Sequence, residues 1–243
     1  MKNYITATIA ALGLIISTAF LANAFKNRNN QNDTISVTGL GSKDFVSDLI
    51  VWNSNFTKKS FELKEAYASL EKDRIAIKTY LSSKGIKENE IVFSSVSINK
   101  EYATSYDENA NVRSQTFNGY SLSQNVQVES KEVEKVENVS RSVSELINSG
   151  VELYSNNPEY YYTKLAALKL EMIAEATKDA RLRAEKIAEN AGSNLGNLKK
   201  SDMGVFQIVA QNSSEEYSWG GSFNTASKNK TATITMKLVY NID

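Results

Sequence analysis

The chain has 243 residues, enough for one or two domains with a substantial core, and its hydrophobic content of 41% is typical of a globular protein. Its 28 basic and 28 acidic residues balance, and no basic run of five or more occurs, so we expect no nucleic-acid partner. The absence of Cys and His excludes disulfides, cysteine lipidation and catalytic triads built on either residue. Carboxylate chemistry and Ser–Lys chemistry remain open.

The N-terminal residues have the features of a targeting segment. Lys2 gives a short positive region, and an uncharged, largely apolar stretch follows it as far as Phe25. This stretch ends in Ala-Asn-Ala at Ala24, a pattern typical of signal-peptide cleavage, which we favour. The alternative is an uncleaved anchor, because about 20 apolar residues span a bilayer. Either interpretation places the chain in the periplasm or cell envelope, with membrane contact only through residues 1–25 if they are retained.

A polar linker at residues 26–33 argues against a buried soluble helix before it and separates the targeting segment from the domain at residues 34–243. Period-two alternation predicts strands in this domain, and apolar residues at spacings of three and four predict helices. The predicted elements are strands at 34–41 and within 45–56, a helix at 60–83, a strand from 91 to about 102, a hairpin loop at 105–114, a strand at 116–129, a helix at 131–149, a strand at 151–154, a helix at 159–190, and strands at 206–210 and 231–240.

The order of these elements, ββ-α-ββ-α-β-α-ββ, predicts an α+β fold. We expect mainly antiparallel sheets with three main helices packed on them. The second half of the last helix presents alanines at a spacing of four, from Ala176 to Ala188. Small side chains allow close approach, so this stripe is expected to be a packing surface.

Several segments together carry a family resemblance. They are Ile35–Gly41 with the pattern I-x-V-x-G-x-G, the turn from Leu81 through Gly85-Ile86 into Ile91, Asn118-Gly119-Tyr120, the alanine helix followed by Ala191-Gly192 and Leu195-Gly196-x-Leu198, and the closing strand to Val239-Tyr240. In this order and spacing they resemble the SIMPL-domain family (DUF541) over about Thr34 to Ile242. The chain differs from common members in its Asn- and Lys-rich surface and in an aromatic loop around Trp219.

The resemblance implies a non-enzymatic binding or assembly module of the cell envelope. Bacterial members of the family are periplasmic or associated with the outer membrane, and some are linked to oxidative stress. An animal member binds a Pelle-like kinase. The family offers no catalytic residue to transfer, so the resemblance implies neither a reaction nor a cofactor.

Two adjacent acidic pairs, at residues 107–108 and 215–216, lie in predicted loops and are the candidates for carboxylate chemistry or cation binding. Asp107-x-Asn109-x-Asn111 has the alternating oxygens of a calcium loop but lacks Gly at the sixth position. A solvated loop is therefore favoured, and we expect no metal and no cofactor.

Gly39-x-Gly41 follows a predicted strand but lacks the third glycine and the helix of a phosphate-binding loop, so a turn at the strand end is favoured. Two classes of function remain: a binding or assembly module, and an envelope enzyme using carboxylate or Ser–Lys chemistry. The first is favoured because no acid, base and orienting group converge in the sequence. We expect no catalytic residues.

Two aromatic groups are candidate interface residues, namely Tyr160, Tyr161 and Tyr162 at the predicted start of the last helix, and Tyr217, Trp219 and Phe223 in a glycine-containing loop. The alternatives are that the tyrosines cover the helix start and that the loop folds its aromatic side chains onto the core.

We also expect a homo-oligomer that uses sheet edges or the aromatic loop, with an envelope protein as a further candidate partner. Lys237 is the only charge in the closing strand at 231–240, so an edge position would leave that strand poorly protected. A central position, with a monomeric domain, is the alternative.

Overall fold

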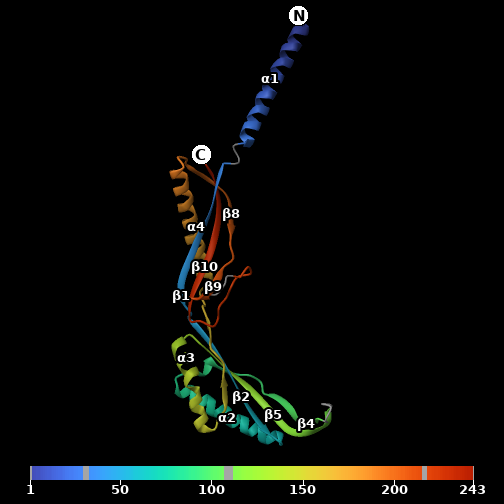
Figure 1. Ribbon diagram of the computed structural model, residues 1–243, viewed down its shortest axis with the longest axis vertical. Coiled ribbons are helices and arrows are strands. Elements are labelled where there is room, and N and C mark those ends of the chain that lie inside the picture. Colours follow the sequence, from blue (N-terminus) through green and yellow to red (C-terminus); the bar gives the residue numbers. More distant parts are fainter. Residues whose placement is uncertain (1, 30–32, 107–111, 215–217, 243) are drawn as a thin grey trace.

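The computed structural model describes residues 2–29, 33–106, 112–214 and 218–242 (Figure 1). Its elements are α1 (Lys2–Asn29), β1 (Thr34–Val46), β2 (Leu49–Ser60), α2 (Leu63–Ser83), the 3-10 helix η2 (Glu88–Glu90), β3 (Ile91–Phe93), β4 (Ser97–Tyr106), β5 (Val112–Ser130), α3 (Val133–Ser142), the 3-10 helix η3 (Val143–Ser149), β6 (Leu153–Ser155), β7 (Glu159–Tyr161), α4 (Leu165–Asn190), β8 (Leu195–Met203), β9 (Gln207–Ala210) and β10 (Asn229–Ile242). This arrangement confirms the α+β prediction.

The helix α1 covers the predicted targeting segment. Its residues 12–25 are exposed, and Figure 1 shows it projecting away from the rest of the chain. Among the helices that the structure describes, none is both long enough and apolar enough to cross a membrane.

The strands form two antiparallel sheets that lie end to end (Figure 1). Sheet A has the order β1-β10-β8, and β9 also pairs with β10. Sheet B has the order β3-β5-β2-β6, with β4 paired to β5 and β7 paired to β2. Each sheet has its own apolar core, because α4 covers one face of sheet A while α2 and α3 pack on sheet B.

Sheet B buries its core under α2 and α3. Trp52 and Phe56 of β2 are fully buried there, as is Leu122 of β5. Ile77 and Leu81 of α2 pack on them from the helix side at the spacing of one helical turn. The apolar alternation of β2 and β5 therefore forms the floor of this core, and the helical stripes close it.

In sheet A, α4 approaches the strands unusually closely. Gly39 and Gly41 of β1 lie under the helix, where a Cβ atom added to Gly39 would be 2.2 Å from the carbonyl oxygen of Ala176. The helix meets these glycines with its buried stripe of Met172, Ala176, Ala180, Ala184 and Ala188. The alanine stripe is thus the packing surface that its spacing predicts, and the Gly-x-Gly segment is part of a strand that the helix covers.

The predicted start of the last helix is wrong. Glu159–Tyr161 forms β7, which pairs with Leu49–Val51 of β2, and α4 begins only at Leu165. Consecutive tyrosines favour extended structure, and their partner strand lies more than 100 residues earlier, beyond the range of a local pattern.

Other boundaries also differ from the prediction. The strand expected from residue 91 to 102 is divided into β3 and β4, and the second helix becomes a 3-10 helix after Ser142. β8 was not predicted, because as an exposed edge strand it shows no alternation of apolar and polar residues. β4 and β5 are paired through Ser105 and Ser114, as the predicted hairpin requires.

The closing strand β10 lies in the centre of sheet A, so the edge position considered for it is wrong. It pairs with β1 on one side and with β8 and β9 on the other. The edge at β1 is blocked at one point, since the Leu40 N–H donates to Asp179 Oδ2 of α4 at 2.9 Å. This N–H, and then the Arg183 guanidinium, lower the pKa of the Asp179 carboxyl, so the cap stays charged at neutral pH.

Candidate functional site

The face of sheet A opposite α4 has no helix on it among the described residues. Gly39 of β1 pairs with Met236 of β10, and both face α4. Side chains alternate along a strand, so Leu40 of β1 and its partner Thr235 point to the opposite face, as does Thr233. The candidate site is built on this uncovered face.

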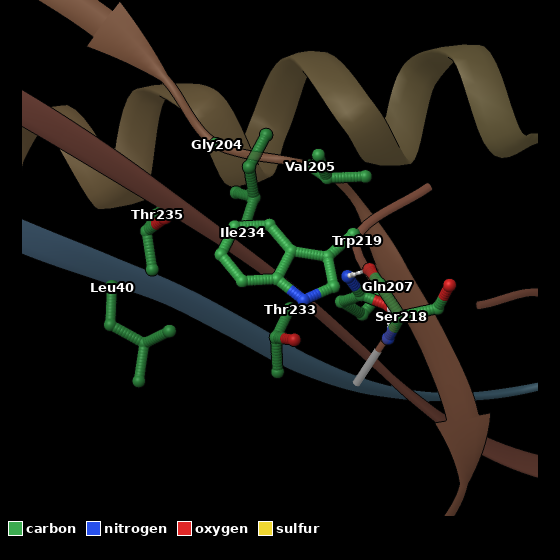
Figure 2. Close-up of a pocket in the computed structure, with 9 residues that line it drawn as sticks. All are labelled: Leu40, Gly204, Val205, Gln207, Ser218, Trp219, Thr233, Ile234 and Thr235. Carbon is green, nitrogen blue, oxygen red and sulfur yellow. Dashed lines mark hydrogen bonds between the residues drawn. The ribbon is translucent and has the colours of Figure 1, made fainter. Parts of the chain in front are cut away.

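A groove of about 570 Å³ crosses this face. It is lined by Leu40, Gly204, Val205, Gln207, Ser218, Trp219, Thr233, Ile234 and Thr235. Figure 2 shows the Trp219 indole in the middle of this group, carried by the loop between β9 and β10. Trp219 is 100% exposed, although a folded chain usually covers much of such a large apolar ring.

The Trp219 loop is held by the side chain of Gln207. Its Nε2 donates to the Ser218 carbonyl oxygen at 2.7 Å, and its Oε1 accepts from the backbone N–H groups of Ser222 at 2.7 Å and Ser218 at 3.3 Å. Gln207 itself is 8% exposed. One buried amide therefore binds the loop on both sides of Trp219.

Backbone pairing adds a second support to the loop. The Ile208 N–H donates to the Ser222 carbonyl oxygen at 2.7 Å, the Asn224 N–H donates to the Ile208 carbonyl oxygen at 2.9 Å, and Ile208 forms a parallel bridge with Phe223. The buried Lys230 also donates from Nζ to the Asn224 carbonyl oxygen at 2.5 Å. Trp219 is thus displayed by a segment anchored to β9 and β10.

We expect Gln207→Glu to detach the loop while preserving side-chain shape. A carboxylate can still accept from the Ser222 N–H but cannot donate to the Ser218 carbonyl oxygen, so a partly buried hydrogen bond is lost at a cost of about 0.5–1.5 kcal/mol. Limited proteolysis should then cut the Trp219 loop faster than in the wild type. Gln115→Glu is the matched control, because Gln115 is exposed in β5 of sheet B, and the Trp219 loop of this variant should keep wild-type resistance. Equal resistance of the Gln207 variant would contradict the anchoring role.

The structure separates the aromatic candidates. Tyr160 is 7% exposed and belongs to the core of sheet B, whereas Tyr161 donates from its hydroxyl to Glu159 and Tyr162 packs its ring 4.8 Å from that of Phe45. Trp219 and Phe223 lie together in the loop, and both are exposed. Tyr217 lies outside the described residues.

One cluster of charged side chains, at the junction of the two sheets, combines carboxylates and a lysine as an acid–base site would. Lys228 Nζ lies 3.0 Å from Glu137 Oε2 and 3.2 Å from Glu134 Oε1. Partial burial tends to raise the pKa of Glu137, but the hydrogen bond from Lys228 and the nearby positive charges outweigh it, so the pKa is lowered. The hydrogen bonds to Glu137 and then Glu134 raise the pKa of Lys228. Glu137 and Lys228 therefore stay charged at neutral pH, and their pair joins the segment just before β10 to α3.

The acidic candidates of the sequence, at residues 107–108 and 215–216 with Asn109 and Asn111, lie outside the described residues. Within the part of the chain that the structure describes, no three acidic side chains gather into a possible cation site. Sequence reasoning identified Trp219 but missed Gln207, Thr233 and Thr235. The only local signal for these three residues was strand alternation, which places their side chains on the opposite face of the sheet from the apolar residues next to them in the sequence.

The architecture can be compared with known families. Residues 35–239 match the profile of SIMPL, described as a protein of unknown function (DUF541), and this match covers both sheets and all helices except α1. The chain belongs to the SIMPL family.

Two relatives of this SIMPL chain carry the name 26 kDa periplasmic immunogenic protein. They come from Brucella melitensis and Brucella abortus, and each is 25% identical to the chain over 203 residues. The alignments cover 81% of this chain and 77% of each relative. The SIMPL match spans β1 and the residues that line the groove, so the site belongs to the family domain.

Proposed function

We propose that this chain is a non-enzymatic binding module of the bacterial cell envelope and that it binds its partner with the uncovered face of sheet A. The observation that carries the proposal is the fully exposed Trp219 beside a groove, in a loop that Gln207 holds at Ser218 and Ser222. Tryptophan is enriched among the residues that dominate binding energy. The periplasmic names of the Brucella relatives and the predicted signal peptide support an envelope location.

The charge arrangement supports binding over catalysis. The groove residues that the structure describes include no acid or base, and the cluster of Lys228 with Glu134 and Glu137 is internally ion-paired. A general acid or base needs a pKa near the working pH, whereas the pKa of Glu137 is lowered and that of Lys228 is raised.

We expect Trp219→Ala to weaken binding of the purified full chain to bacterial envelope fragments by at least about thirtyfold, the equivalent of about 2 kcal/mol for a dominant contact residue. Co-sedimentation at several chain concentrations measures the change. Phe61→Ala is the matched control, since Phe61 is 65% exposed but lies in the turn between β2 of sheet B and α2. Equal losses in both variants, or none in the Trp219 variant, would contradict binding through this face.

The proposal includes assembly into a homo-oligomer, and β8 is the edge suited to it. Seven consecutive residues of this edge strand, 197–203, are exposed, and among them Leu198 and Met203 are 51% and 62% exposed. The outer side of an edge strand offers backbone groups to a second copy, and Leu198 and Met203 would add apolar contact between the charged side chains of β8. We expect Leu198→Asp to lower the mass of the full chain in light scattering at micromolar concentration, whereas Leu182→Asp on the exposed side of α4 should not. A wild-type monomer would refute self-association.

A further inference from the structure

We propose that the ligand of the groove is a neutral glycan, with one sugar ring stacked on the Trp219 indole and its hydroxyl groups bonded to the threonines of β10. This inference rests on the proposed function, because it names the chemistry of the partner for the same surface. Three properties of the groove support it. The described lining residues are uncharged, they combine an aromatic ring with hydroxyl groups, and they lie over a central strand.

None of the described residues that line the groove carries a charge. A phosphate or carboxylate entering it would lose water without gaining an opposite charge, which is unfavourable. Charges of both signs flank the groove on this face: Asp44 of β1 pairs with Thr231 at one end, and Lys237 of β10 lies at the other, opposite Asp202 of β8. Asp202 also pairs with Lys200 at 2.7 Å, so positive and negative groups alternate there. The groove therefore favours an uncharged ligand.

The lining combines apolar and hydroxyl groups in a way that matches a sugar ring. The C–H groups on one face of a pyranose can pack on the electron-rich face of the indole, with Leu40 and Val205 adding apolar contact. Thr233, Thr235 and Ser218 bring hydroxyl groups that both donate and accept hydrogen bonds. A purely apolar ligand would cover these hydroxyls without replacing their hydrogen bonds to water.

A peptide strand fits this surface less well. Extended peptides usually add to a sheet through backbone hydrogen bonds at an edge. The floor of the groove is β10, whose backbone is already paired with β1 on one side and with β8 and β9 on the other. Recognition here must come from side chains, and the volume of about 570 Å³ lies within the range of small-ligand sites. The anchored loop also reduces the ordering cost of binding.

The two tryptophans of the chain make a direct test possible. Trp52 is fully buried and Trp219 is fully exposed, so iodide should quench essentially the Trp219 fluorescence of the full wild-type chain. We expect cellotetraose, maltotetraose or fully N-acetylated chitotetraose to protect Trp219 from iodide in a saturable manner. Protection by none of them at millimolar concentration would overturn the proposal, and so would protection by an uncharged acetylated and amidated Ala-Leu tetrapeptide in their place.

Variants that keep the reporter identify the contacts. Thr235→Val preserves shape and removes one hydroxyl, so the oligosaccharide affinity should fall about two- to tenfold. Lys237→Ala should leave it unchanged, because the ligand is neutral; a loss comparable to that of Thr235→Val would point to an anionic ligand and overturn the proposal. If oligosaccharides fail while Trp219→Ala still abolishes envelope binding, the ligand class is wrong and the binding function stands. If both fail, the site itself is wrong.

Discussion

Replacing Gly39 with alanine will destabilise the chain by about 2–3 kcal/mol, the upper part of the range for overpacked positions. The new Cβ would lie 2.2 Å from the Ala176 carbonyl oxygen and 2.3 Å from the Ala180 backbone nitrogen, so the helix backbone itself must move. The smaller backbone entropy of alanine in the unfolded chain offsets only about 0.4–1 kcal/mol of this. Thermal unfolding followed by circular dichroism should show a melting temperature lower by roughly 4–12 °C.

The control is Gly220→Ala in the Trp219 loop. A Cβ there meets no atom within 4 Å, so we expect a change below about 0.5 kcal/mol. Gly41→Ala should resemble the Gly39 variant, because its Cβ would lie 2.5 Å from the Met172 carbonyl oxygen. A Gly39 variant as stable as the Gly220 variant would show that α4 does not sit directly on β1.

Removing Lys58 will destabilise sheet B more than removing its partner Asp73. Lys58 Nζ lies 2.9 Å from Asp73 Oδ2, and the two side chains are 25% and 7% exposed. Lys58→Met leaves a carboxylate buried without its counter-charge, for which we expect a loss of about 3–5 kcal/mol. Asp73→Asn leaves an ammonium group that can reach water, so its effect should be smaller, about 1–2 kcal/mol.

Urea unfolding followed by the fluorescence of the buried Trp52 measures these changes, because Trp52 belongs to the same core. The double variant Lys58→Met/Asp73→Leu should recover much of the loss, since it removes both charges together. Lys186→Met is the control, because Lys186 and Glu189 form an exposed pair that should contribute little to stability. Equal losses of stability in Lys58→Met and Asp73→Asn would contradict the prediction that the unpaired carboxylate costs more than the unpaired ammonium group.

Local sequence patterns were sufficient to predict the helices and strands that bury one face completely. β1 and β10 alternate because one face of each meets α4, and the alanine stripe of α4 has its spacing for the same reason. β8 has no such face, so its sequence carries no period. β7 was not predicted, because its aromatic residues are compatible with a strand or a helix. Only its pairing with β2, far away in the sequence, makes it a strand.

The candidate site shows the same division. The exposed aromatic loop could be recognised from Trp219 and its neighbouring glycines, because that signal is contiguous in the chain. The groove could not, since its floor depends on the register that places Leu40 beside Thr235. The role of Gln207 depends on three contacts made by one buried amide, and such contacts leave no trace in a hydropathy pattern.

The discontinuity of sheet A has a consequence for biogenesis. All strands of sheet B lie between Leu49 and Tyr161, so this sheet can form early. β1 of sheet A cannot pair until β10 has been synthesised. β1 ends at Val46 and β10 begins at Asn229, and at about 5–20 residues per second the roughly 180 residues between them take about 9–36 s to synthesise. During that interval the β1 segment is a nascent strand without its partner, the kind of segment that invites aggregation. We therefore expect a holding chaperone to act mainly on β1, which is the first strand synthesised and, among the described strands, pairs only with the last one.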